Sequence, residues 1–179
     1  MTFKWSSSMS SESVPYAPLP ASQALPEFNP NLSRSLSVSG SPFEQFRSTV
    51  AARTELLTNN EWTLIFPDKG ASFHKAIQSN SQTNGYADFK GAVSFKLERY
   101  LETNLHYQDY RFNDAYQATI EPDTLEGTAQ ASPAQVLSLT FHNKTASKKL
   151  NYIDHPVIGT LIYFEPMPLE DAIDEMSGR

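Results

Sequence analysis

Several residue types that chemistry depends on are missing or scarce in this chain. None of its 179 residues is a cysteine, which excludes disulfide bonds and thiolate chemistry. Glycine occurs only seven times, and the G-x-x-x-x-G-K pattern of a phosphate-binding loop is absent. No apolar run reaches the roughly 18–20 residues that a membrane-spanning helix needs. These absences exclude a thiol enzyme, a P-loop enzyme and a helical membrane span.

Positive charge is scarce as well. The chain has 14 Lys and Arg against 20 Asp and Glu, a net charge of −6 and a pI near 5.2. Nucleic-acid binding depends on a basic surface, and anionic membranes attract basic segments. The composition therefore argues against a nucleic-acid partner and weighs against a membrane surface.

The composition divides the chain into three parts. Residues 1–42 are rich in serine and proline and predict a flexible or draping segment that is disordered or extended. With 39% hydrophobic and 12% aromatic residues overall, the rest can build a core, and its length fits one domain over 43–166. Residues 167–179 form an acidic tail that is expected to fray.

The strongest helix signal lies at 42–58. Ser41 is a good N-cap, Pro42 suits the first helical position, and Glu44 completes a capping box. The apolar positions that follow helical spacing are Phe43, Phe46, Val50 and Leu57. We expect this amphipathic helix to lay one face on a sheet.

After this helix the chain reads mainly as β-strands. Alternating or β-prone runs occupy 62–66, 89–112 with a bend at Thr103-Asn104, and 136–142, and a short strand is expected at 118–120. Short connections favour antiparallel pairing. The predicted fold class is α+β, a largely antiparallel sheet packed by one main amphipathic helix.

The chain closes with a predicted hairpin at 148–166, KKLNYIDHPVIGTLIYFEP. Pro156 separates two β-prone runs and suits a turn, because it fixes φ and lacks an N–H. Gly159 inside the second run indicates a bulge or a close backbone approach.

Two segments resemble those of a bacterial family. The run NYIDHPVIGTLIYFEP is similar to the closing motif of the CsiV family of periplasmic peptidoglycan-binding proteins, and FKGAVSFKLERYL at 89–101 resembles its middle strand. A weaker match covers 46–62, so the matches run in family order from about residue 43 to residue 166. The chain departs from the family pattern in having no apolar first strand, and in carrying lysines where family members tend to carry arginines: Lys144, Lys148 and Lys149.

The resemblance implies a non-enzymatic periplasmic protein that binds peptidoglycan and supports cell-wall synthesis and cell shape. It also implies a partnership with the activator system of a bifunctional penicillin-binding protein. The first residues, MTFKWSSSMSSES, lack the apolar core of a secretory signal. Either the protein is cytoplasmic or the sequence starts downstream of its signal, and the resemblance favours the second explanation.

Peptidoglycan binding calls for aromatic faces that hold the glycan. It also calls for cations nearby, because the stem peptides carry carboxylates. The residues that fit this requirement are Arg99, Tyr100, Tyr107, Tyr110, Arg111, Lys148, Lys149, Tyr152 and His155. Tyr107 and Arg111 have the same parity, so without a bulge one strand face presents a ring and a cation together. The competing interpretation is that the tyrosines fill the core and the lysines belong to a solvated turn.

Catalytic and metal-binding patterns are weak. The four histidines are far apart and show no ligand spacing, so no metal, cofactor or catalytic residue is predicted. Asp154 and His155 are neighbours that point to opposite faces, so we expect Asp154 to bond the turn backbone and His155-Pro156 to set the turn geometry. A wall hydrolase would need two converging acids, and the candidates on paper are Glu98, Glu102, Asp109 and Glu121.

A further alternative is a cell-envelope interaction domain that binds a partner protein and no glycan. In this interpretation the last strand, 158–164, lies at a sheet edge and pairs with a strand of the partner.

Overall fold

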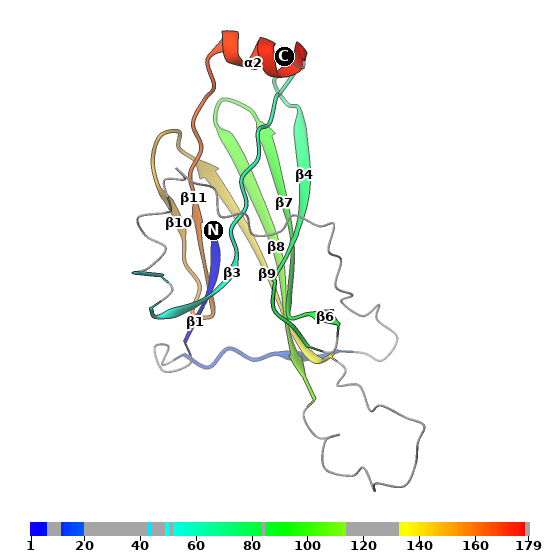
Figure 1. The fold of residues 1–179 in the computed structure, drawn as a ribbon. Helices are drawn as coiled ribbons and strands as arrows, with labels where there is room; N and C mark the ends of the chain where they lie inside the picture. Colours follow the sequence, from blue (N-terminus) through cyan, green and yellow to red (C-terminus); the bar gives the residue numbers. More distant parts are fainter. Residues whose placement is uncertain are drawn as a thin grey trace, which may run out of the picture.

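The computed structural model describes residues 1–6, 12–19, 43, 49–50, 52–83, 85–113 and 133–177. These residues form mostly antiparallel β-structure and a short C-terminal helix, α2 (Leu169–Ser177), as Figure 1 shows. This arrangement fits the sheet-dominated α+β class. None of the described helices is long and apolar enough to cross a membrane.

The larger sheet has five antiparallel strands in the order β2-β9-β8-β7-β4. Their bounds are β2 (Ala17–Pro18), β9 (Pro133–Thr145), β8 (Leu101–Phe112), β7 (Phe89–Leu97) and β4 (Ser72–Gln78). The long strands alternate apolar and polar residues, so one face of each can be buried. A small hairpin, β5 (Gln82–Thr83) and β6 (Tyr86–Ala87), lies between β4 and β7 in the chain.

The second sheet has four antiparallel strands in the order β10-β11-β1-β3. Their bounds are β10 (Asn151–Ile153), β11 (Ile158–Ile162), β1 (Thr2–Trp5) and β3 (Thr54–Thr58). Strand β1 pairs with β11 on one side and with β3 on the other. The first residues of the chain are therefore at the centre of this sheet.

The core lies between the two sheets, which form the two layers seen in Figure 1. The buried apolar cluster draws on both layers: Leu57, Ile77, Phe89, Val93, Phe95, Leu101, Leu105, Tyr107 and Ile158. In β1 the side chains of Thr2 and Lys4 contact β8, so they point inward. Phe3 and Trp5 therefore lie on the opposite face of this sheet, where their rings meet edge to face and Phe3 is buried.

Two parts of the segment 1–42 differ from the flexible or draping chain expected for it. Residues 2–5 form β1, and residues 17–18 pair with β9. The composition of the segment could not predict strand β1, because the residues that pair with Thr2, Phe3 and Lys4 are at 158–160. The remaining parts of the segment lie outside the described residues.

The predicted helix at 42–58 is wrong at its end. Thr54–Thr58 is strand β3, in which Leu57 faces the core, whereas Thr49 and Val50 are helical. The seven-residue spacing from Val50 to Leu57 fits a helix, but pairing with β1 sets the conformation of the last five residues. The proposed cap residues Ser41, Pro42 and Glu44, together with Phe46, lie outside the described residues.

The strand predictions hold in part. Strands β7, β8 and β9 occupy the expected β-prone regions, but the turn is at residues 98–100 rather than at Thr103-Asn104. Residues 62–66 belong to no ladder, although Trp62 packs on Phe95 with ring centroids 5.8 Å apart. The strand expected at 118–120 lies outside the described residues.

The closing hairpin is confirmed as strand, turn and strand, with β10 and β11 paired. The expectation that the last strand lies at a sheet edge is wrong, because β11 is bonded to β10 on one side and to β1 on the other. Its backbone groups are already used within the sheet, so it cannot accept a strand from a partner.

Candidate functional site

Two places in the structure gather polar and charged side chains. The first, the polar cleft, has a volume of about 240 Å³ and lies between β1, β3 and β8. Its lining residues are Lys4, Glu55, Leu57, Thr83, Asp88, Asp109, Tyr110 and Phe112. The second, the charged end, is formed by the β7–β8 turn at residues 98–100 and the β9–β10 turn at residues 146–150.

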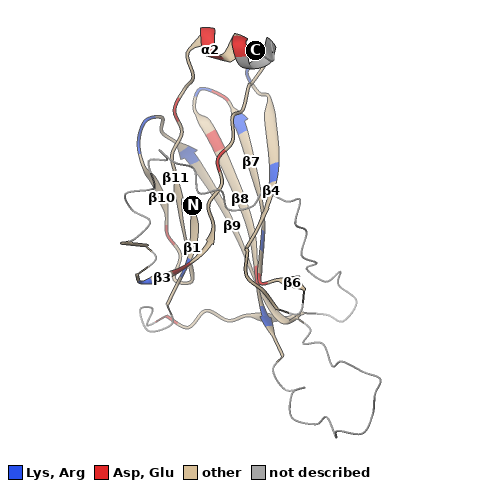
Figure 2. Ribbon diagram, in the orientation of Figure 1, with Lys and Arg blue, Asp and Glu red and all other residues tan. Residues whose placement is uncertain are grey.

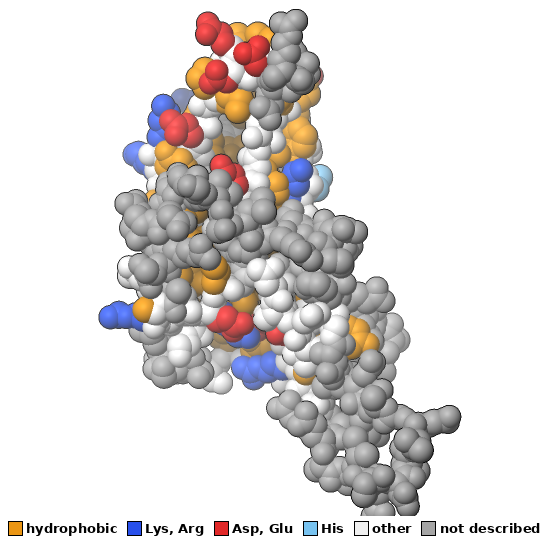
Figure 3. Space-filling view, viewed as in Figure 1, with side chains coloured by type: hydrophobic (Ala, Val, Ile, Leu, Met, Phe, Trp, Pro, Cys, Tyr) orange, Lys and Arg blue, Asp and Glu red, His pale blue; other side chains and the backbone are white. Residues whose placement is uncertain are grey.

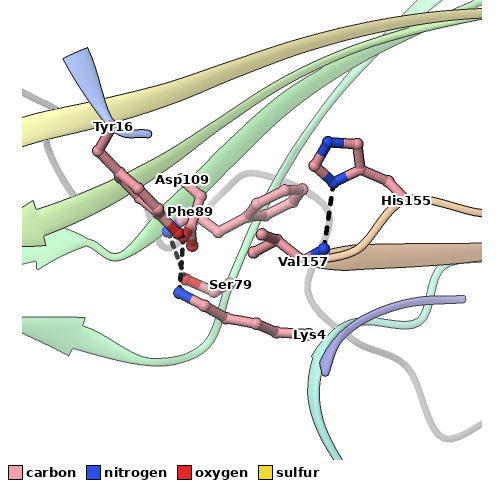
Figure 4. A network of polar contacts seen from close by, with 7 residues as sticks. All are labelled: Lys4, Tyr16, Ser79, Phe89, Asp109, His155 and Val157. Atoms are coloured by element: carbon pink, nitrogen blue, oxygen red, sulfur yellow. Dashed lines mark hydrogen bonds and ion pairs between the residues drawn. The ribbon is translucent and has the colours of Figure 1, made fainter. Parts of the chain in front are cut away.

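Asp109 organises the polar cleft. It continues the inward alternation of β8 after Leu105 and Tyr107, and only 1% of its side chain is exposed. Lys4 Nζ donates to Asp109 Oδ2 at 2.6 Å, and the Tyr16 hydroxyl donates to the same oxygen (Figure 4). A buried carboxylate needs such partners, since its desolvation is otherwise costly. Asp109 therefore joins β1, β8 and the segment 12–19.

Tyr16 is held from a second side. The guanidinium carbon of Arg111 lies 3.7 Å from the centre of the Tyr16 ring, a cation–π contact. Burial and the adjacent Asp109 carboxylate raise the pKa of Tyr16, so the phenol remains protonated and donates its hydrogen bond. Arg111 therefore packs on Tyr16, a partner that the spacing of residues along β8 did not predict.

The other acids of the cleft are less buried. Asp88 Oδ1 accepts a hydrogen bond from Thr83 Oγ1 at 2.8 Å, and Glu55 is exposed on β3. The cleft can therefore admit a small polar molecule near Glu55 and Asp88, while Asp109 is occupied by Lys4 and Tyr16. In the part of the chain that the structure describes, no three acids or histidines lie close enough together to hold a metal ion.

Tyr107 is a core residue. Its hydroxyl hydrogen-bonds Thr160 at 3.1 Å and Thr2 at 3.3 Å, which links β8 to the opposite sheet. Burial raises its pKa, while the two threonine contacts act in the opposite direction.

Tyr107 and Arg111 do not present a ring and a cation together to solvent. Tyr107 is buried and Arg111 is exposed, although both have odd numbers. The β8–β9 register is regular through Arg111 and shifts only between Arg111 and Phe112, so Tyr107 and Arg111 lie on the same face of β8. Tyr107 is covered by the opposite sheet, whereas Arg111 lies near the end of the strand and packs on the Tyr16 ring. The spacing of a strand predicts a shared face, but it does not show which positions of that face are covered.

The charged end brings four of the predicted ligand residues to one region. Leu101 at the start of β8 pairs with Thr145 at the end of β9, so the turns beside these residues lie at the same end of the sheet (Figure 2). Arg99 and Tyr100 are on one turn, with the guanidinium carbon 5.6 Å from the ring centre. Lys148 and Lys149 are exposed on the other turn.

The charges at this end are only partly paired. Lys148 Nζ lies 3.3 Å from Glu165 Oε1, and Lys96 Nζ lies 2.8 Å from Glu98 Oε1. The Tyr100 ring is 52% exposed, so its face can be reached from solvent. Exposed pairs of this kind contribute little to stability, which leaves their side chains available to a ligand.

Tyr152 and His155 lie on the closing hairpin and serve its geometry. Tyr152 stacks on Phe3, and its hydroxyl donates to Asp154 Oδ1 at 2.5 Å. His155 Nδ1 accepts the Val157 N–H at 3.2 Å (Figure 4). The turn backbone is therefore bonded by His155 and not, as expected, by Asp154.

Of the predicted ligand residues, the structure brings Arg99, Tyr100, Lys148 and Lys149 together and separates them from Tyr107, Tyr110 and Arg111. Tyr110 is buried, lines the polar cleft and donates its hydroxyl to Gln108 Oε1 at 2.9 Å. The contact of Lys4 and Tyr16 with Asp109 was not predicted. Its only signal in the sequence was an acid at an inward position of β8.

Comparison with known proteins adds no relative to these observations. No family model, curated protein or solved structure matches the chain. A functional assignment therefore depends on the residues and contacts described above and on the motif resemblance.

Proposed function

We propose that this protein is a non-enzymatic peptidoglycan-binding protein of the periplasm that supports cell-wall synthesis. The closing motif and the Arg-Tyr-Leu strand, which resemble the CsiV family, support this proposal. The same resemblance suggests the activator system of a bifunctional penicillin-binding protein as its protein partner.

One structural observation carries the proposal. The charged end combines an exposed ring, Tyr100, with the cations of Arg99, Lys148 and Lys149 on two adjacent turns. Cations of this kind bind carboxylates, which peptidoglycan stem peptides carry, and an exposed ring provides a flat face for a sugar. The charged end therefore has the chemistry that this polymer requires.

Co-sedimentation with purified peptidoglycan sacculi tests the proposal. We expect saturable pelleting that weakens as salt is raised, because screening reduces the attraction of exposed charges. The variant Arg99→Gln, Lys148→Gln, Lys149→Gln should pellet at least several-fold less. A matched control, Arg53→Gln, Lys75→Gln, Lys90→Gln, removes the same charge elsewhere and should pellet like the unaltered protein. A folded sample that does not pellet, or two triple variants with equal pelleting, would refute wall binding at this end.

The polar cleft supplies the alternative of a wall hydrolase, because Glu55, Asp88 and Asp109 line it. Glu98 and Glu102 are near the charged end, away from Asp109, and Glu121 lies outside the described residues. Asp109 accepts hydrogen bonds from both Lys4 and Tyr16. These donors stabilise the ionised carboxylate, which is unsuited to delivering a proton to a substrate. We therefore expect no soluble muropeptides to be released in the pelleting experiment, and their release would favour the hydrolase.

A cell-envelope protein-interaction domain without glycan binding is the other alternative. It is favoured by the exposed apolar side chains near the charged end, which include Leu150 and Leu169. A folded protein that does not pellet with sacculi would support this interpretation.

A further inference from the structure

The outer face of the five-stranded sheet gathers most of the histidines of this chain. Along β4, β7, β8 and β9 the odd-numbered side chains face the core, so the even-numbered ones point outward. Three of the four histidines, His74, His106 and His142, are at even positions and are exposed. We call this surface the histidine face. It consists of the even-numbered residues within 72–78, 90–96, 102–108 and 138–144.

The register of the strands makes neighbours of two of these histidines. His142 of β9 lies opposite Asn104 of β8, and His106 of β8 lies opposite Thr140 of β9. Asn104 also lies opposite Ser94 of β7. Residues directly opposite each other on one face of an antiparallel pair are close enough for their side chains to interact. His106 and His142 therefore belong to one continuous polar patch.

The hydrogen bonds of this patch allow both imidazoles to take up a proton. His142 Nδ1 lies 2.7 Å from Asn104 Oδ1, which can only accept, so Nδ1 carries the proton of the neutral ring. The Asn104 amide is oriented by its donation to Ser94 Oγ at 3.3 Å. His106 Nδ1 lies 3.1 Å from Thr140 Oγ1, and a hydroxyl can donate or accept. Protonation therefore breaks neither bond and adds a positive charge to an exposed ring.

The histidine face is basic although the protein is acidic. Lys90, Lys96 and Lys144 are among its residues, and Glu102 is its one acid. Glu98, in the adjacent turn, pairs with Lys96 at 2.8 Å. The whole chain has a net charge of −6, and Figure 3 shows acidic side chains gathered at the end that carries α2. A basic patch on an acidic protein attracts anionic ligands to that patch.

The side chains of the histidine face favour one class of anion. None of its residues has a phenyl, phenol or indole ring, or an apolar side chain larger than that of alanine. Single-stranded nucleic acids stack on such rings, and membrane surfaces take up apolar side chains. An acidic polysaccharide requires neither, because its carboxylates bind cations and its hydroxyls hydrogen-bond amide, hydroxyl and imidazole groups.

We propose that the histidine face binds an acidic polysaccharide, a sugar chain that carries carboxylates, and binds it more tightly as the pH falls. Lys90 and Lys144 supply positive charge throughout, and His106 and His142 add charge between about pH 7.5 and 5.5, where imidazoles titrate. The carboxylates of the polymer remain ionised, because carboxyl groups titrate near about pH 4. This inference goes beyond the proposed function and uses none of the residues assigned to wall binding.

Isothermal titration of the full chain with polygalacturonate in low salt tests the proposal. The unaltered protein should bind roughly fivefold more tightly at about pH 5.5 than at about pH 7.5, as two additional exposed charge contacts imply. The variant His106→Gln, His142→Gln should lose most of this rise and match the unaltered protein at the higher pH. The control His155→Asn removes a histidine from the closing hairpin and should keep the full rise.

Two further controls separate the charge of the face from the charge of the protein. Lys144→Gln should weaken binding by about twofold at both pH values, whereas Arg53→Gln, beside β3 in the other sheet, should not. Dextran, a neutral polysaccharide, should not bind at either pH.

Several outcomes would overturn the proposal. One is the absence of binding to polygalacturonate, and another is a full pH-dependent rise in the histidine variant while circular dichroism shows it folded. Tighter binding to a single-stranded oligonucleotide or to anionic vesicles would overturn it in favour of that ligand. The histidine variant keeps Arg99, Lys148 and Lys149, so it should pellet with sacculi like the unaltered protein. Failure of polysaccharide binding is therefore distinguishable from failure of wall binding.

Discussion

Asp109 illustrates how a single side chain obtains its role from distant neighbours. The sequence places it on the inward face of β8, where an isolated carboxylate would be unfavourable. The structure supplies Lys4 from β1 and Tyr16 from the segment 12–19. Both donors are more than 90 residues away in the chain. The contact therefore stabilises the junction of three segments.

Gly159 is a second residue whose identity is set by tertiary packing. It pairs with Phe3 across β1 and β11, and an added Cβ would lie 2.5 Å from Phe3 Cε2 and Cζ. We expect Gly159→Ala to lower the free energy of unfolding by about 1–3 kcal/mol through overpacking. Urea unfolding would measure the change.

The same substitution in a protein that also carries Phe3→Leu tests whether the Phe3 ring causes the loss of stability. In a Phe3→Leu protein the two obstructing ring carbons are absent, so Gly159→Ala should cost less than in the unaltered protein. Equal costs in both backgrounds would show that the Phe3 ring is not the cause.

At the scale of elements, the closing hairpin depends on a neutral histidine. His155 Nδ1 accepts the Val157 N–H, an arrangement that protonation of Nδ1 would abolish. Burial lowers the pKa of His155, and the carboxylates of Asp154 and Glu12 offset part of this effect.

The direction of the pH effect follows from this shift. The pKa of His155 in the folded protein lies below the ordinary 6.5, so the unfolded chain binds a proton first as the pH falls. The stability that neutral His155 contributes is complete above that value and is lost as the pH falls through the folded pKa. We expect His155→Asn to reduce the loss of unfolding free energy measured between about pH 7.5 and 5. The control His74→Asn, at an exposed position of β4, should retain the full loss, and equal pH profiles for the two variants would contradict this account.

At the scale of the whole molecule, the fold is assembled by pairing between the two ends of the described chain. Strand β1 lies between β11 and β3, and Met1 O accepts a hydrogen bond from Leu161 N at 2.8 Å. Removing residues 1–6 would separate β11 from β3 and expose Ile158 and Leu57 of the core.

We therefore expect a chain that lacks residues 1–6 to lose cooperative thermal unfolding. A chain that lacks residues 169–179 should keep its melting temperature, because Leu169 and Ile173 are 76% and 52% exposed and their removal uncovers little apolar surface. Calorimetry of both proteins would check this contrast. A similar loss of cooperativity in both would mean that α2 contributes to the core.

Much of the β-structure was predictable because its signals are local. The alternation of Val93 and Phe95 in β7, and of Leu137 and Leu139 in β9, has the period of a half-buried strand. Pro156 marked the turn of the closing hairpin in the same way. The sequence by itself also excluded thiol chemistry, since no tertiary arrangement can supply a cysteine.

The tertiary structure alone decided the rest. Strand β1 and the end of the predicted helix at 42–58 became strands because each found a ladder partner far away in the chain. The opposite sheet covers Tyr107 and leaves Arg111 exposed, and register decided that Arg99 lies at the same end as Lys148. Local sequence carries the period of a strand, but pairing and register depend on the free energy of contacts between distant segments. For that reason the residues of the charged end could be nominated from the sequence, and only the folded chain could bring them together.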